Sequence, residues 1–181
     1  GANFFEVVRQ MRDVLGANPC PIELPIGAEE TFKGVVDLVK MKAYFWPEAD
    51  ESHNYVVEEI PANMLAECEE WRDKMLETIA EFDDELMEKF FGGEDLTSAE
   101  VHAALRKSVL DGEIAPILVG SAIKNIGVHT LLDMMIEYLP NPQDLNPMVG
   151  VDPNGNEVEV KTNVSSSNLA LTTLVIVLAT V

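Results

Sequence analysis

Apolar positions recur at helical spacing at the start of the chain. They are three or four residues apart, and the set is Phe4, Val8, Met11 and Leu15. This spacing is typical of one face of an amphipathic helix. Asn3 is suited to cap its first turn, and Gly16 to end it. The pattern therefore predicts a helix that begins near residue 4 and ends before Gly16.

A strand pattern follows the first helix. Ile22, Leu24 and Ile26 alternate with other residues, and residues 32–46 are rich in Val and aromatic side chains. After a Pro- and acid-containing loop, residues 55–57 form a third short apolar run. Runs of this length and composition, bounded by turn residues, are typical of strands. We expect these three segments to form a small antiparallel sheet.

Three helices are predicted next. The first has six apolar residues on one face, namely Met64, Cys68, Trp71, Met75, Ile79 and Phe82. A second, shorter helix near residues 86–90 ends at two glycines. The third begins at Thr97, where Thr97 and Glu100 have the spacing of a capping box, and stops at Gly112.

The pattern changes again after Pro116. Residues 117–119 are continuously apolar, as in a strand that is covered on both faces of a parallel sheet. The polar loop 120–125 separates this strand from an amphipathic helix that two prolines terminate after Leu139. Strand, loop and helix in this order indicate an α/β fold with a parallel sheet unit.

These predictions divide the chain into five parts. Residues 1–19 and 115–142 are expected to be pieces of one α/β domain, and residues 20–114 an α+β insert between them. Residues 143–168 are expected to be a polar linker with a short strand near 158–160, and residues 169–181 another strand. Because the chain lacks an initiator Met and ends in an apolar run, we interpret it as a piece of a longer protein.

Charge narrows the choice of partners. The formal net charge is −20, and residues 48–113 hold 20 acidic against five basic residues, a net of −15. Such a surface repels phosphate backbones, so this piece is not expected to bind nucleic acid directly. A basic protein surface is the better partner for the insert. For any single acidic side chain, a solvated helix face is the simpler interpretation.

Other classes of function receive little support. The apolar run 169–181 is shorter than the ~20 residues that a membrane-spanning helix needs. Cys20 and Cys68 show no pairing pattern, which suits free thiols in the cytoplasm. Adjacent carboxylates occur at 58–59, 69–70 and 83–84, but these stretches are dense in charge, so a small hydrolase is the weakest hypothesis. The three histidines lack metal-ligand spacing.

Several segments carry a family resemblance. They are Gly1-Ala2-Asn3-Phe4, Leu15-Gly16-Ala17-Asn18-Pro19, Leu24-Pro25-Ile26-Gly27-Ala28-Glu29-Glu30, Gly34-Val35-Val36-Asp37-Leu38-Val39, Met41-Lys42-Ala43, Gly120-Ser121-Ala122-Ile123-Lys124-Asn125 and Tyr138-Leu139-Pro140-Asn141-Pro142. In order and spacing, over residues 1–145, they resemble the translational GTPases of the elongation factor G family.

The resemblance implies a specific architecture and function. Members use GTP, with Mg²⁺, to drive translocation of tRNA and mRNA on the bacterial ribosome. The chain would hold part of a P-loop-GTPase-type parallel sheet, interrupted at 20–114 by the family's G′ subdomain. That insert faces the C-terminal domain of the ribosomal stalk protein. Residues 169–181 would begin a β-barrel domain.

The same resemblance assigns a nucleotide-binding loop to Ser121, Ala122 and Ile123. The Ala122 N–H would donate to the guanine O6, and Ser121 would hold the loop shape. Without the resemblance, this sequence is a common tight turn. The phosphate-binding pattern G-x-x-x-x-G-K-[ST] and the guanine-reading Asn-Lys-x-Asp pattern are absent from the chain. We therefore expect no catalytic residue, and no bound GTP or Mg²⁺, in this piece alone.

Two further expectations follow. The strand 117–119 would lack its parallel neighbours, so its edges, and the tail after Asn168, are expected to make the piece self-associate. The alternative to a GTPase fragment is a stand-alone acidic protein-interaction module.

Overall fold

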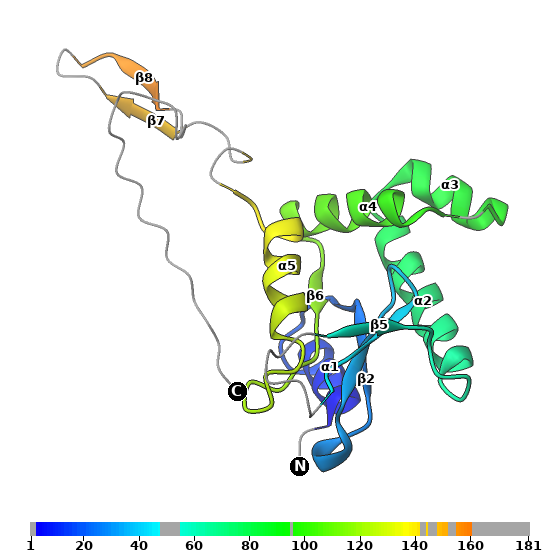
Figure 1. The fold of residues 1–181 in the computed structure, drawn as a ribbon. Coiled ribbons are helices and arrows are strands. Elements are labelled where there is room, and N and C mark those ends of the chain that lie inside the picture. Colours follow the sequence, from blue (N-terminus) through cyan, green and yellow to red (C-terminus); the bar gives the residue numbers. More distant parts are fainter. Residues whose placement is uncertain are drawn as a thin grey trace. The chain divides into compact units, whose positions relative to one another are not determined.

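The computed structural model describes residues 3–47, 55–94, 96–141, 144, 148–151 and 155–160 (Figure 1). The chain divides into two compact units, and the boundary between them in the sequence lies between Leu139 and Pro140. In the first unit the elements are α1 (Phe4–Asp13), β1 (Pro19–Pro21), β2 (Glu23–Ile26), η1 (Glu29–Thr31), β3 (Gly34–Asp37), β4 (Lys42–Phe45), β5 (Val56–Glu58), α2 (Leu65–Ala80), α3 (Asp84–Gly92), α4 (Ser98–Leu110), β6 (Ala115–Ile117) and α5 (Val128–Tyr138). The second unit holds β7 (Met148–Val151) and β8 (Glu157–Val160).

Local capping signals fix the helix starts. The Asn3 side chain accepts a hydrogen bond from the Glu6 N–H at 3.2 Å, at the predicted start of α1. At α4, Thr97 and Glu100 form the predicted capping box: each side chain accepts from the other residue's backbone N–H. These bonds satisfy N–H groups that a helix start otherwise leaves without a partner.

Strands β1 and β6 form a two-stranded parallel sheet, with Cys20 opposite Pro116. The predicted strand 117–119 is thus displaced: the strand begins at Ala115 and ends at Ile117. It also has a parallel neighbour, so the expectation that it would lack one altogether is wrong. The ladder stops early because the Val119 N–H donates to the Glu23 side chain, at 3.2 Å, rather than to a strand.

The predicted antiparallel sheet is present, with strand order β2-β3-β4-β5, but the run 32–46 folds into two strands, β3 and β4, so the sheet has four strands instead of three. Its register places Leu24 opposite Val36 and Val35 opposite Tyr44. Because successive strand residues point to opposite faces, Leu24 and Val36 share one face, and Glu23, Val35 and Tyr44 share the other. All four residues of β3 are buried, which shows that both faces are covered.

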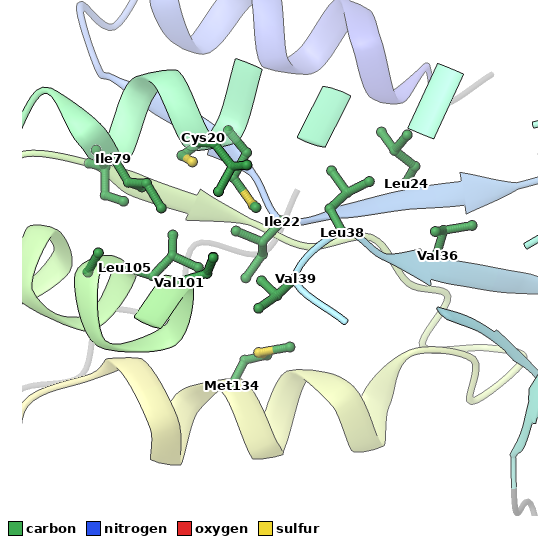
Figure 2. Close-up of a cluster of buried hydrophobic side chains, with 14 of the residues drawn as sticks. Cys20, Ile22, Leu24, Val36, Leu38, Val39, Ile79, Val101, Leu105 and Met134 are labelled. Carbon is green, nitrogen blue, oxygen red and sulfur yellow. The ribbon is translucent and has the colours of Figure 1, made fainter. Parts of the chain in front are cut away.

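The main core lies on the Leu24 face. Figure 2 shows side chains of this cluster, among them Cys20 from β1, Leu24 from β2, Ile79 from α2, Val101 and Leu105 from α4, and Met134 from α5. This cluster of buried residues draws on segments both before and after residue 114, so the insert and the flanking elements share one core. A smaller cluster on the opposite face gathers Phe32, Val35, Tyr44, Trp46 and Ile126, with Val119 packed against it.

The second unit contains an antiparallel pair, in which β7 joins β8 and Gly150 lies opposite Val158. The short strand predicted near 158–160 is confirmed as β8, whereas β7 lies in a segment expected to be linker. The segment 169–181 lies outside the described residues. The α/β fold predicted from the sequence is confirmed. None of the helices that the structure describes is long and apolar enough to cross a membrane.

Gly34 offers a test of the β3–β4 packing. A Cβ at this position would lie 2.3 Å from the Tyr44 carbonyl oxygen, so Gly34→Ala must displace a strand. We expect it to lower the free energy of unfolding by about 2 kcal/mol, as overpacked cores do. Gly92→Ala is the matched control, because nothing lies within 4 Å of its Cβ, and helix propensity predicts a gain of up to ~1 kcal/mol. Urea unfolding measures both, and equal effects would contradict the packing argument.

Candidate functional site

The residues predicted to bind nucleotide lie in the loop 118–127, which connects β6 to α5. The backbone of Ser121 is bridged to that of Ile126 by two hydrogen bonds, of 2.9 and 3.1 Å. Within this bridge, the Asn125 N–H donates to the Ala122 carbonyl at 3.3 Å, and Asn125 has a φ of 55°. Residues 121–126 therefore form a closed, narrow turn.

Two glycines allow the loop to close. A Cβ on Gly120 would lie 2.8 Å from the Ile126 carbonyl oxygen, and one on Gly127 would lie 2.7 Å from that of Val119. Gly127 also has a φ of 78°, a conformation that L side chains rarely adopt. No side chain fits at either position without moving the backbone opposite.

Lys124 fixes the loop from outside. Its Nζ donates to the carbonyl oxygens of Glu30 at 2.9 Å, Phe32 at 3.3 Å and Glu29 at 3.4 Å. These carbonyls belong to η1 and the residue after it, so the ammonium caps the end of a helical turn. The loop is thereby tied to the connection between β2 and β3.

The structure brings Ser121, Ala122 and Ile123 together on this turn. Ser121 is half-buried, and its Oγ accepts from the Lys124 N–H at 3.4 Å. Ala122 is exposed, and the Ile123 side chain is 100% exposed. Across the described residues, no hydrogen bond is found to the N–H of Ala122 or Ile123. The turn thus leaves the N–H groups of two adjacent exposed residues without a partner among the described residues, while the binding role of these residues stays a prediction.

Sequence patterns missed Glu23, which lies beneath the loop. Its side chain is 0% exposed, and its Oε2 accepts from the Val119 N–H. Burial raises the pKa of Glu23 to about 7, although its bond to the Val119 N–H and the nearby Thr130 hydroxyl act to lower it. The carboxyl oxygen Oε1 has no hydrogen-bond partner among the described residues. The available signal was an acid inside an apolar strand, at a position that alternation places on the face opposite Leu24.

Other candidate groups show no convergent chemistry. Over the part of the chain that the structure describes, no three His, Cys, Asp or Glu residues are placed to hold a metal ion. His102 is hydrogen-bonded to the Tyr138 hydroxyl and stacked on its ring. Of the adjacent carboxylates, those at 58–59 and 69–70 are exposed, and Asp83 caps α3 by accepting from the Leu86 N–H. His53 lies outside the described residues.

Part of the acidic surface lies on α2. Its exposed acids are Glu67, Glu69, Glu70, Asp73 and Glu77. Lys74 pairs with Glu70 at 2.6 Å on the same helix. Since a single exposed pair contributes little, this face of α2 remains strongly negative and is available to a basic partner.

Comparison with known proteins adds a structural likeness. No protein-family model matches the chain. A crystal structure of a protein from Thermus thermophilus is similar, with a TM-score of 0.68 and 28% sequence identity over 84% of this chain. The match covers 24% of that protein, so this chain spans about a quarter of its length. The likeness supports the α/β fold and carries no statement of activity.

Replacing Lys124 tests what holds the loop. Lys124→Met removes the ammonium that binds three carbonyls, and the expected cost is about 1 kcal/mol, because the group is exposed. The order parameters of the Ala122 and Ile123 amides, measured by ¹⁵N relaxation, should fall below those of the wild type. Lys74→Met is the control, since that lysine binds only within α2. Unchanged order parameters in Lys124→Met would show that the Ser121–Ile126 bridge and the two glycines hold the loop without the lysine.

Proposed function

We propose that this chain is part of a ribosome-dependent translational GTPase of the elongation factor G type, and that it supplies the guanine-side loop and a stalk-protein docking insert. The observation that carries the proposal is the turn 121–126 beyond β6, in which the N–H groups of Ala122 and Ile123 have no hydrogen-bond partner among the described residues. A loop that leaves the carboxyl end of a parallel strand is where α/β proteins bind ligands.

The proposed contact with guanine is made by the protein backbone. The guanine O6 is an acceptor that a main-chain N–H can recognise, and adenine carries an amino group at the same position. A donor fixed in a closed turn binds without first being ordered, which lowers the cost of association. Two features hold the turn in one conformation. They are the hydrogen-bonded bridge between Ser121 and Ile126 and the bond from Lys124 to the Glu30 carbonyl.

Phosphates and Mg²⁺ belong to the rest of the proposed parent protein. This sequence lacks the G-x-x-x-x-G-K-[ST] pattern whose backbone and lysine hold phosphates. No residue of this chain is therefore assigned to the phosphates, to Mg²⁺ or to the attacking water. GTP hydrolysis is proposed only for a longer chain that includes those segments.

The second proposed contribution is docking of the stalk protein's C-terminal domain. The exposed acids of α2 would attract a basic surface and speed encounter, a long-range effect that salt screens. The same acids support the alternative, a stand-alone acidic interaction module, which needs no nucleotide. The two hypotheses differ in one respect: only the first requires that the gene's reading frame continue upstream through a phosphate-binding loop.

The guanine contact is testable in the longer parent chain. 6-thio-GTP keeps the N1–H and 2-amino groups of GTP but replaces O6 by sulfur, a weaker acceptor. We expect it to bind about tenfold more weakly than GTP, a difference of ~1.4 kcal/mol. Ala122→Pro removes the donor, so it should weaken GTP binding and abolish the difference between the two nucleotides. Titration calorimetry measures both affinities.

Ala122→Ser is the control for that experiment, because it changes the side chain and keeps the N–H. It should discriminate the two nucleotides as the wild type does. The proposal fails if the wild type binds both nucleotides equally, or if Ala122→Pro discriminates them as strongly as Ala122→Ser.

Docking is testable with the present chain and the stalk protein's C-terminal domain. Binding should be detectable at low ionic strength and weaken as salt is added, because exposed charges are screened over about 10 Å at 0.1 M salt. The charge-reversed variant Glu69→Lys/Asp73→Lys should bind at least about fivefold more weakly. Glu157→Lys/Glu159→Lys makes the same change in net charge on β8 and should bind as the wild type does. Salt-independent binding, or equal losses in both variants, would refute a docking surface on α2.

A further inference from the structure

The region beneath the loop 118–127 holds a buried acid to which the proposed function gives no part. We propose that Glu23 is a positioning residue for this loop: its carboxyl group holds the loop at Val119 and competes for the hydroxyl that secures Gly127. This inference rests on the proposed function for its biological meaning, because the loop carries residues 121–123, but its geometry and its test are independent of nucleotide.

The first contact fixes the start of the loop. Glu23 is fully buried, on the sheet face that Val119 and Ile126 cover. Its Oε2 accepts the Val119 N–H at 3.2 Å. This bond turns the backbone out of the β6 ladder, which ends two residues earlier at Ile117. The path of the chain into the turn is therefore set by a side chain from β2.

The second contact concerns the end of the loop. The Thr130 hydroxyl donates to the Gly127 carbonyl at 2.9 Å, and the same hydroxyl lies near enough to the Glu23 carboxyl to lower its pKa. A hydroxyl has one proton to donate. An ionised Glu23 competes for that proton, whereas a protonated Glu23 leaves it to Gly127. The protonation state of Glu23 thus bears on how firmly the left-handed Gly127 is held.

The surroundings favour the neutral acid. The charged or titratable groups that face Glu23 are Asp37, its cross-strand neighbour on β3, and the hydroxyl of Tyr44 on β4. Thr130 faces it from α5 and the Val119 amide from the loop, and neither is charged. Among the described residues, Lys40 lies 3.8 Å from Asp37, but no cation pairs with Glu23. An ionised Glu23 is therefore a buried charge without a counterion.

The sign of the pH effect follows from the pKa. The pKa of Glu23 is raised from 4.5 to about 7 when the loop covers it. The covered state binds the proton more tightly than the open state, so covering is most favourable at low pH. This preference is lost progressively as the pH rises from about 4.5 to about 7. Opening of the loop should therefore become easier near neutral pH.

Amide hydrogen exchange of the 181-residue chain tests the proposal. After correction for intrinsic exchange rates, the protection of residues 118–127 should fall about tenfold between pH 6 and pH 8, as expected when an acid with pKa near 7 is covered and one of ordinary pKa is exposed. Amides of the α2 and α4 core serve as the internal reference and should show no such fall. In Glu23→Gln the loop should stay protected at all pH values, because the amide keeps an acceptor for Val119 and does not ionise.

Two further variants separate positioning from a merely structural role. Glu69→Gln removes an exposed carboxyl and should keep the wild-type pH profile. Thr130→Val removes the shared hydroxyl while it leaves Glu23 in place, so it should reduce loop protection at low pH. Because this hydroxyl lowers the pKa of Glu23, its removal should also extend the fall in protection to higher pH. This variant also serves as the test if Glu23→Gln does not fold. A wild-type profile without pH dependence, or a Glu23→Gln profile like that of the wild type, would overturn the proposal.

The outcome is distinguishable from that of the nucleotide experiment. Exchange measures the loop without any ligand, whereas discrimination between GTP and 6-thio-GTP measures the guanine contact. Loss of pH dependence in Glu23→Gln, combined with no nucleotide discrimination, would support positioning by Glu23 and reject the proposed function.

Discussion

The parallel pairing of β1 with β6 is the constraint on which the rest of the first unit depends. It places Cys20 opposite Pro116, and the neighbouring Ala115 N–H donates to the Asn18 carbonyl at 2.9 Å. Three prolines leave few donors for this ladder, so its own hydrogen bonds cannot offset the closure of so long a segment. The core that Cys20 shares with α2 and α4 must contribute the remainder. After this pair, the chain runs from β6 across the Glu23 face of the antiparallel sheet, where Val119 and Ile126 pack.

The distribution of basic residues explains how a strongly negative chain keeps both a stable core and an acidic surface. Arg72 donates to the carbonyls of Leu38 and Val39, the second at 2.8 Å, and Lys107 donates to the Phe82 carbonyl at 3.1 Å. Lys124 binds three carbonyls in the same way. These cations secure backbone turns, and Lys107 Nζ also lies 3.7 Å from the Asp83 Oδ2. Among the described residues, none of the three forms an ion pair with an exposed acid of α2. The acids of α2 therefore remain largely uncompensated, which is what an electrostatic docking surface requires.

Local signals in the sequence were sufficient for the helices and the antiparallel sheet. Capping by Asn3 and Thr97 depends on neighbours within one turn, and such signals can be read directly from the chain. Long-range features could not be predicted in this way. Pro19–Pro21 has the composition of a turn and becomes a strand only because β6 lies beside it. The burial of Glu23 depends in the same way on a loop far along the chain, which covers the sheet face opposite Leu24.

The loop is the part of this unit that is best able to exist in two states. The sheet and helices share a close-packed core, and such packing does not deform gradually. By contrast, the loop 118–127 is held by a few specific bonds, and one of them depends on a titratable carboxyl. Coupling between two sites requires an element whose equilibrium both sites influence. If a partner on α2 and a ligand at residues 121–123 affect each other, the bond between Glu23 and the Val119 N–H is where we expect the loop to respond.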